Sequence, residues 1–330
     1  MRAIFLCDDK ANVARVYGGK TAERLRAAFD LDETVYTLSE LDDVRFQEVE
    51  VIFSTWGMPN VESEKIKKCL PKLKALFYAA GSVQNFARNF LESGVRVFSA
   101  WRANAIPVVD YTLAQIILAN KGFYSLSRIC KEDYERAHQT LERYNGNYNA
   151  KVGIIGDGAI GGQVIRRLKD YNLQVYVFSI TMTQEEARAL GVELASLEQI
   201  FSECDVISNH LANNEKTKKM IGAELINRLK PYATFINTAR GAQVDEAALI
   251  AKCKSDPTIT AVLDVTDPEP PAPNSELYAL ENVVLTPHIA GSSGEEVKRM
   301  GEYMADEAAR YLAEEACLFE VTPDMLKTMA

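Results

Sequence analysis

Short apolar runs along this chain alternate with longer stretches in which apolar residues recur every three or four positions. In the first third of the chain, the runs predict strands at residues 3–6, 51–54 and 75–78. The longer stretches predict helices near residues 21–29, 62–70 and 84–91. Because parallel strands need crossover helices, this alternation is typical of a doubly wound α/β unit.

A second alternation follows a strongly apolar stretch at 103–122, which predicts a long helix that is buried or lies at an interface. Further apolar runs predict six strands at residues 152–155, 175–178, 205–209, 234–237, 260–264 and 283–286. Six such strands suit a Rossmann sheet. After Gly294, apolar residues recur at helical spacing and predict a final amphipathic helix, at Val297, Met300, Met304, Ala308 and Tyr311.

Length and charge narrow the class of protein. A chain of 330 residues exceeds a single core, so two domains are expected. The 47% of apolar and 25% of charged residues are typical of a soluble globular protein. With 46 acidic and 37 basic residues, the net charge of −9 repels nucleic-acid phosphates and anionic lipids, so neither partner is expected. An anionic substrate would need locally placed arginines.

The cysteines predict a reducing environment. No C-x-x-C pair and no histidine cluster at metal-ligand spacing occurs, so we expect reduced core thiols and no metal at Cys7, Cys69, Cys130, Cys204, Cys253 and Cys317. The apolar run at 3–6 is too short for a signal peptide, and no run approaches the ~18 residues of a membrane span. We therefore expect a cytoplasmic protein.

A glycine motif directly follows the predicted strand at 152–155. Gly156, Gly158 and Gly161 form G-x-G-x-x-G. A predicted helix begins within the motif, at Ala159, and Ile160 follows. The first glycine permits a tight turn, the second admits a pyrophosphate, and the third allows close helix packing. The positive end of the helix dipole favours the phosphates. The order of strand, motif and helix predicts a dinucleotide site.

The acidic residue that usually binds the ribose hydroxyls of NAD is missing. The next predicted strand ends at Phe178, and Ser179 follows it. No carboxylate repels a 2′-phosphate there, yet the residues at 180–183 bring no Lys or Arg to bind one. Ser179 could bind either coenzyme through its hydroxyl, or simply end the strand. NAD is favoured, and NADP stays open.

Three further segments place reactive residues at predicted strand ends, at 237–241, 263–270 and 286–291. Together with the glycine motif they resemble the D-isomer-specific 2-hydroxyacid dehydrogenase family, which includes D-lactate, D-glycerate, glyoxylate/hydroxypyruvate and phosphoglycerate dehydrogenases. The resemblance is strongest over 152–291 and extends to segments 78–83 and 103–105.

The resemblance implies that Arg240 binds the substrate carboxylate and keto oxygen, that Glu269 pairs with His288, and that His288 moves the proton. Each role has a chemical reason. Reduction of a keto carbon leaves negative charge on its oxygen, and imidazole can protonate it near neutral pH. A neighbouring carboxylate stabilises the imidazolium. The planar guanidinium can bind a carboxylate in two contacts.

Taken singly, an arginine after a strand is usually a surface charge and a lone histidine a structural residue. The spacing of Arg240, Glu269 and His288 supports their joint assignment.

The resemblance also implies that Asp264 holds the nicotinamide carboxamide, that Thr238 and Ala239 line the nicotinamide, and that His210 acts toward the coenzyme through its backbone. His138 should be a surface residue. Backbone N–H groups around Ala80, Gly81, Ser82 and Val83 would bind the substrate carboxylate.

For the architecture, the resemblance implies a Rossmann NAD(P)-binding domain at 101–292. It would be inserted into a flavodoxin-like substrate domain formed by 1–100 and 293–330. The substrate would be a small 2-keto or 2-hydroxy acid, and the protein a homodimer. The helix at 103–122 is a candidate dimer surface, although its apolar stripe could instead be buried within one chain.

Two alternatives stay open. Arg102, beside Trp101, could recognise a second anionic group of the substrate or be a solvated hinge residue. A non-enzymatic dinucleotide sensor, like the C-terminal binding protein corepressors on the same fold, would retain the same residues. Nothing near His288 identifies the 2-hydroxy acid, and the physiological direction is likewise undetermined by sequence.

Overall fold

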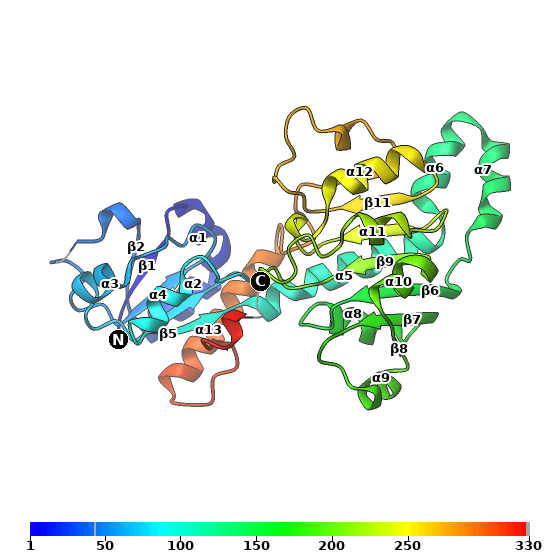
Figure 1. Ribbon diagram of the computed structural model, residues 1–330. Helices are drawn as coiled ribbons and strands as arrows, with labels where there is room; N and C mark the ends of the chain where they lie inside the picture. Colours follow the sequence, from blue (N-terminus) through cyan, green and yellow to red (C-terminus); the bar gives the residue numbers. More distant parts are fainter. Residues whose placement is uncertain (43, 328–330) are drawn as a thin grey trace. The chain divides into compact units, whose positions relative to one another are not determined.

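The chain forms two compact units in a computed structural model that describes residues 1–42 and 44–327. One unit comprises Met1–Ala105 and Ser292–Ala330, and the other comprises Ile106–Gly291 (Figure 1). The division falls inside the long helix α5 (Trp101–Asn120). The second unit is thus continuous in sequence, whereas the first is built from both ends of the chain.

The first unit contains a six-stranded sheet. Its strands are β1 (Arg2–Leu6), β2 (Asp30–Tyr36), β3 (Val51–Ser54), β4 (Ala75–Tyr78), β5 (Arg96–Ser99) and β13 (Glu320–Val321). The order is β13-β5-β4-β3-β1-β2, with all neighbours parallel except β13 and β5. Without β13, the order 2-1-3-4-5 is that of flavodoxin.

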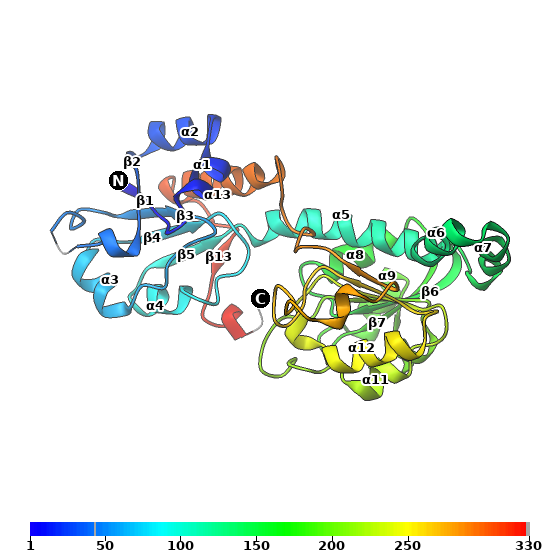
Figure 2. The same ribbon diagram turned by 90° about the horizontal axis from the view of Figure 1, so that it is seen from above.

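Helices cover both faces of this sheet (Figure 2). On one face lie α1 (Lys10–Tyr17), α2 (Lys20–Ala28) and α13 (Glu296–Leu312), and on the other lie α3 (Ser63–Cys69) and α4 (Ala87–Glu92). Two 3-10 turns complete the unit, η1 (Leu38–Glu40) and η5 (Met325–Lys327). Helix α13 contacts α1 and α2, so the two ends of the chain share one core.

The second unit contains a seven-stranded sheet in which every neighbouring pair is parallel. Its strands are β6 (Tyr148–Ile155), β7 (Asn172–Phe178), β8 (Glu193–Leu194), β9 (Val206–Asn209), β10 (Thr234–Asn237), β11 (Thr260–Leu263) and β12 (Val283–Leu285). The order β12-β11-β10-β9-β6-β7-β8 is the Rossmann order with one added edge strand.

Two separate cores lie on the two faces of this sheet. Alternate residues of one strand, such as Phe235 and Ile236, belong to different cores. One core includes residues of α10 (Leu197–Glu203), α11 (Ala223–Asn227) and α12 (Glu246–Ser255), and the other includes residues of α5, α8 (Gly161–Leu168) and α9 (Gln184–Leu190). The remaining elements are α6 (Phe123–Glu132), α7 (Tyr134–Thr140), η2 (Leu141–Arg143), η3 (Gly241–Gln243) and η4 (Glu276–Tyr278).

The predicted fold class is confirmed, because two doubly wound sheets are present and one has the Rossmann order. Several elements escaped sequence prediction. Strands β2, β5, β8 and β13 were not predicted. Strand β2 is rich in acidic residues and only one of its residues is buried, so it lacks the apolar run that predicted other strands. The helix predicted at 84–91 begins only at Ala87. The final helix is confirmed, since Val297, Met300, Met304 and Ala308 are buried.

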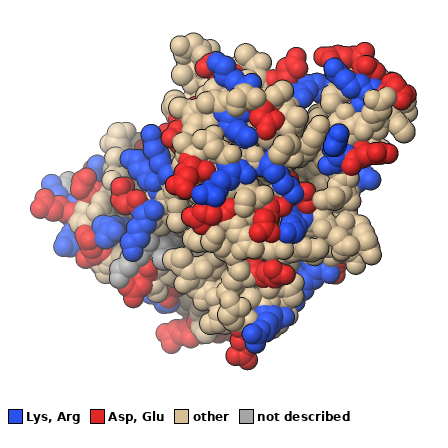
Figure 3. Space-filling model, turned by 45° about the vertical axis from the view of Figure 1, so that its right-hand side comes forward, with Lys and Arg blue, Asp and Glu red and all other residues tan. Residues whose placement is uncertain are grey.

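The cysteines and the surface charges can be compared with the sequence. All six cysteines are free, but Cys130 is exposed and Cys317 is partly exposed, so the prediction of core thiols is wrong for these two. On the face shown in Figure 3, basic and acidic residues are interspersed. Among the described residues, no cluster of side chains suited to a metal ion occurs, and no helix could cross a membrane.

The contact between α13 and α1 yields a stability prediction. A Cβ atom at Gly301 would lie 2.2 Å from the carbonyl oxygen of Val16. Because backbone must move to admit it, Gly301→Ala should lower the free energy of unfolding by about 1–3 kcal/mol. Denaturant unfolding measures the effect. Gly222→Ala is the control, since a Cβ there meets nothing nearer than 3.7 Å. Equal stability of the two variants would contradict the packing.

Candidate active site

The carboxyl ends of six parallel strands in the second unit form a single row. Paired residues run across the sheet in the order Phe178, Ile155, Asn209, Asn237, Leu263 and Leu285. The residue after each of these is, in the same order, Ser179, Gly156, His210, Thr238, Asp264 and Thr286. The fold therefore brings the sequence-predicted coenzyme residues of five strands to one edge. The order of strands reverses between β6 and β9, where such sheets bind ligands.

The glycine motif has the geometry that a dinucleotide needs. Gly156 has φ +91°, and a Cβ on it would lie 2.9 Å from the carbonyl oxygen of His210. A Cβ on Gly161 would lie 2.0 Å from the Gly156 oxygen, so the first turn of α8 can close only without a side chain. At Gly158 a Cβ would meet no atom within 4 Å, which leaves the backbone open to a ligand. Ala159 and Ile160 lead into α8, which begins at Gly161, two residues later than predicted.

Asp264 organises the loop that carries His288. Its buried carboxylate accepts a hydrogen bond from the Thr286 hydroxyl at 2.6 Å, and from the backbone N–H groups of Ile289 at 2.8 Å and Ala290 at 2.9 Å. The His288 N–H also donates to the Asp264 carbonyl oxygen at 3.1 Å. His288 itself has φ +55°, a conformation that costs a non-glycine residue of order 1–3 kcal/mol. The buried carboxylate holds it there.

His288 and Glu269 form a hydrogen-bonded pair of imidazole and carboxylate at this edge. Nδ1 of His288 lies 2.6 Å from Oε1 of Glu269, a hydrogen-bonding distance. The two side chains are 45% and 40% exposed, so Nε2 of the imidazole can reach a ligand from solvent. With Nδ1 bound to the carboxylate, Nε2 is the atom that can exchange a proton with a substrate.

Arg240 follows β10 and is partly buried. Its Nη1 donates to the Ala239 carbonyl oxygen at 2.6 Å. Burial lowers the pKa of the guanidinium, and the charge of Glu269 opposes this effect. An arginine stays charged in either case. The loop that bears Arg240 touches the loop that bears Glu269, because a Cβ at Gly241 would lie 2.0 Å from the carbonyl carbon of Thr266.

A buried network of amides positions the Arg240 turn, and sequence reasoning did not identify it. Oδ1 of Asn237 accepts from the Ala239 N–H at 3.1 Å, and its Nδ2 donates to the Arg240 carbonyl oxygen at 3.0 Å. Asn209 donates to Asn237 at 3.1 Å and to Gln243 at 2.7 Å. All three amide residues are buried. The only sequence signal was an asparagine at the end of two successive strands.

The other two histidines differ from His288 in their surroundings. Burial lowers the pKa of His210 to about 4, so its ring is neutral near neutral pH. Its N–H donates to the Ile155 carbonyl oxygen at 2.8 Å, which ties the turn after β9 to the end of β6. His138 is exposed, as expected. Among the residues that the structure describes, neither histidine has a carboxylate partner like that of His288.

Two predicted nicotinamide residues also lie at this edge. Thr238 and Ala239 are buried in the turn after β10, and the Thr238 hydroxyl lies 3.4 Å from that of Thr112 on α5. Helix α5 is itself part of the core, because Val109 and Ile116 are buried against the sheet. Its apolar stripe is therefore largely buried within one chain.

The predicted substrate loop follows β4 in the first unit. The Ser99 hydroxyl lies within hydrogen-bonding distance of the carbonyl oxygens of Ala80, at 2.9 Å, and Gly81, at 2.8 Å. Within the described residues, the N–H groups of Gly81, Ser82 and Val83 donate to no other group. A loop with fixed carbonyl groups and unused donors is suited to an anion.

Arg102 is engaged by aromatic rings in the same unit. Its guanidinium lies 4.8 Å from the centroid of the Trp101 ring and 5.8 Å from that of Phe319. Such stacking is a common structural use of arginine. The contacts give Arg102 a packing role and leave its role toward a substrate an untested hypothesis.

Comparison with known proteins identifies relatives of the chain. The family model described as "D-isomer specific 2-hydroxyacid dehydrogenase, NAD binding domain" matches residues 113–290. Glyoxylate reductase of Korarchaeum cryptofilum is 31% identical over 245 residues, which cover 73% of this chain and 74% of that enzyme. D-3-phosphoglycerate dehydrogenase of Archaeoglobus fulgidus is 31% identical over 249 residues, which cover 75% of this chain but only 46% of that enzyme.

A solved structure shares the fold over nearly the whole chain. The D-mandelate dehydrogenase of Rhodotorula graminis superimposes with a TM-score of 0.80 at 21% identity, covering 97% of each chain. The comparisons agree with the two doubly wound sheets and with a nicotinamide dinucleotide as coenzyme.

The amide network yields a second stability prediction. Asn237→Ala would leave the Ala239 N–H and the Arg240 carbonyl without their partner, and we expect a loss of about 1–3 kcal/mol in the free energy of unfolding. Thermal and denaturant unfolding measure it. Asn227→Ala on the exposed side of α11 is the matched control. A variant as stable as this control would show that the network does not support the turn.

Proposed function

The chain belongs to the D-isomer specific 2-hydroxyacid dehydrogenase family, and we propose that it transfers a hydride between NAD(P)H and C2 of a small 2-keto acid. The observation that carries the proposal is the His288–Glu269 pair at the carboxyl edge of a Rossmann sheet. Family membership makes a nicotinamide coenzyme part of the reaction and an oxidoreductase the class of enzyme.

In the reductive direction, His288 supplies the proton. A reduced nicotinamide coenzyme, held by the glycine motif, would supply the hydride to C2, and the keto oxygen would gain negative charge as the new C–H bond formed. Nε2 of the protonated imidazole donates its proton to that oxygen, which becomes the hydroxyl of the 2-hydroxy acid. Glu269 stabilises the protonated imidazole through Nδ1 and holds the ring in place. In oxidation, neutral His288 accepts the same proton.

Arg240 polarises the keto group and binds the substrate carboxylate in this scheme. Its guanidinium is partly desolvated, so its charge acts more strongly on a nearby anion than it would in water. The Asn237 amide fixes the turn from which it projects. We further propose that the unused backbone donors at residues 81–83 of the first unit can bind an anion such as a carboxylate.

The coenzyme contacts follow from the row of strand ends. We propose that Gly156, Gly158 and Gly161, with Ala159 and Ile160, hold the pyrophosphate through backbone N–H groups and the positive end of α8. Ser179 and the His210 turn would lie along the adenosine half. Thr238, Ala239 and Asp264 would contact the nicotinamide half. Because three donors already bind the Asp264 carboxylate, it would accept from the carboxamide at its one remaining acceptor position of about four.

We propose a cytoplasmic location for this enzyme. The coenzyme is a soluble intracellular metabolite, and the free state of all six cysteines suits a reducing compartment.

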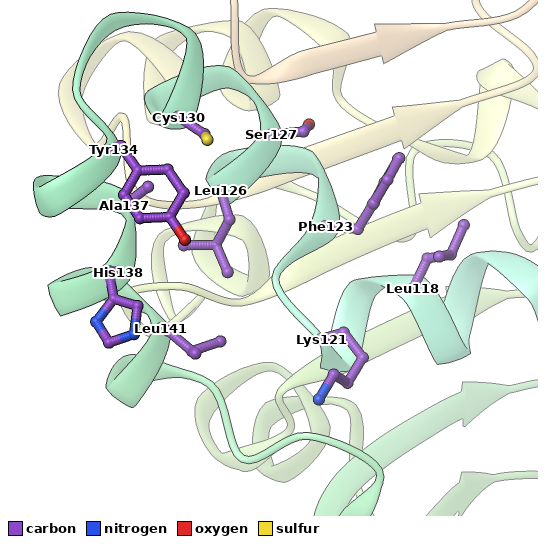
Figure 4. A pocket seen from close by; sticks show the side chains of 10 residues that line it. All are labelled: Leu118, Lys121, Phe123, Leu126, Ser127, Cys130, Tyr134, Ala137, His138 and Leu141. Carbon is purple, nitrogen blue, oxygen red and sulfur yellow. The ribbon is translucent and has the colours of Figure 1, made fainter.

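We also propose that the protein is a homodimer that buries an apolar groove on the second unit. The groove has a volume of about 380 Å³ and lies between the end of α5, α6 and α7 (Figure 4). Phe123 is 49% exposed and Tyr134 is 71% exposed, which is unusual for large aromatic side chains. A second copy of this chain is the proposed partner, on the resemblance to a dimeric family. The proposed dimer surface lies at one end of α5 and not along it, because the apolar stripe of that helix is largely buried within one chain.

A panel of 2-keto acids with NADH and NADPH tests the function. It contains glyoxylate and 3-phosphohydroxypyruvate, after the relatives, with pyruvate and phenylglyoxylate. We expect wild-type turnover with at least one acid. His288→Gln should lower kcat by about 10²- to 10⁴-fold because the proton donor is lost, while coenzyme binding is retained.

Asn227→Ala, on the exposed side of α11, is the control for this variant, because Asn227 lies neither at a strand end nor in the proposed dimer groove. Its kcat should equal that of the wild type. Coenzyme binding without turnover on any acid would overturn the dehydrogenase proposal and favour the dinucleotide sensor.

Analytical ultracentrifugation tests the dimer. Phe123→Glu combined with Tyr134→Glu should convert a dimer into a monomer, because charge would be buried at the interface. Val44→Glu, at an 80% exposed residue of the first unit, is the control and should remain dimeric. A monomeric wild type, or a dimer that survives the double substitution, would refute the assigned surface.

A further inference from the structure

The glycine motif places a carboxylate at the end of β7. Asp157 lies between Gly156 and Gly158, and its Oδ1 accepts a hydrogen bond from the Ser179 hydroxyl at 2.7 Å. The Thr181 hydroxyl lies 3.2 Å from each of its carboxylate oxygens. The Gly156 N–H donates to the Phe178 carbonyl oxygen at 2.8 Å, so the loop is attached to the same strand end.

This strand end has a defined role in dinucleotide sites. The second strand of a Rossmann sheet usually ends in Asp or Glu, which binds the ribose hydroxyls of the adenosine. In this chain that strand is β7, and the residue after it is Ser179. Asp157 brings a carboxylate to the same place from the neighbouring loop.

We propose that Asp157 replaces the missing strand-end acid and makes the site select NAD(H) over NADP(H). The inference rests on the proposed function, since it assumes a dinucleotide on the glycine motif. A carboxylate has about four acceptor positions, so Asp157 can accept further hydrogen bonds from ribose hydroxyls. The 2′-phosphate of NADP(H) would bring negative charge beside it and be repelled.

The surroundings of Asp157 leave its charge unneutralised. Within the described residues it forms no ion pair, and the segment at 179–183 contains no Lys or Arg. Arg166, on the following helix, is exposed and makes no ion pair with it in that part of the chain. The residues at 179–183 thus contribute no cation that could offset a 2′-phosphate at this strand end.

Ser179 is a positioning residue for this carboxylate. Its oxygen accepts the N–H groups of Thr181 at 3.0 Å and Met182 at 2.8 Å. Its proton then points to Asp157 at 2.7 Å, which fixes the carboxylate against the strand end. Ser179, at the position where an acidic residue is usual, therefore holds the Asp157 carboxylate that the glycine loop supplies.

Fluorescence titrations of NADH and NADPH, without substrate, test the proposal. Wild type should bind NADH more tightly than NADPH. Asp157→Asn keeps the side-chain shape and removes the charge, so the ratio of the two Kd values should move toward NADPH by on the order of tenfold or more. Ser179→Ala should move it the same way by less. Glu185→Gln, an equal charge change at an exposed residue in the first turn of α9, should leave the ratio unchanged.

Two outcomes would overturn the inference. One is a wild type that binds NADPH as tightly as NADH. The other is an Asp157→Asn variant, folded by circular dichroism, whose two Kd values change by the same factor, because Asp157 would then support the loop alone. The titration is independent of turnover. If Asp157→Asn shifts the ratio of the two Kd values but the wild type turns over no acid of the panel, only the proposed reaction is rejected. If the wild type turns over an acid but the ratio does not shift, only the role of Asp157 is rejected.

Discussion

All strands of the second unit's sheet are parallel and paired in a continuous register, and this constraint determines where the chemistry lies. A parallel sheet places the carboxyl ends of its strands at one edge, and residues far apart in sequence, such as Gly156 and Asp264, become neighbours of one row. A shift of one strand by a single residue would turn its side chains to the other face and remove its turn from the row. The two cores on opposite faces of the sheet oppose such a shift.

Buried polar groups convert this row into a defined geometry. Asp264, Asn209 and Asn237 are buried at strand ends, where an unsatisfied donor or acceptor would cost about 1–3 kcal/mol. Asn209 and Asn237 accept backbone N–H groups of the turns that follow their own strands, and Asp264 accepts those of the turn after the neighbouring strand β12. The left-handed conformation of His288 depends on this, because Asp264 accepts the N–H groups of Ile289 and Ala290. Strain at the reactive residue is thus offset by a buried carboxylate beneath it.

The exposed ion pair of the site has a different purpose. His288 and Glu269 are both more than a third exposed, and a pair of this kind contributes about 0–1 kcal/mol to stability. The short Nδ1 to Oε1 distance therefore matters mainly for orienting the imidazole ring. The contacts of Asp157 with Ser179 and Thr181 are likewise partly exposed, so they also serve mainly to orient a side chain.

The sequence by itself determined the α/β class, the Rossmann sheet and the residues after each strand, because apolar runs and glycine spacing are local signals. It missed β2, whose exposed acidic residues carry no such signal. Only the tertiary structure showed the amide network around Asn237 and the approach of Asp157 to Ser179, since both join segments at least 22 residues apart. Hydrogen bonds between distant strand ends depend on register, and no local pattern encodes their partners. The missing acid after β7 was correctly read from the sequence, whereas the carboxylate that stands in its place became visible only when the loop and the strand were brought together.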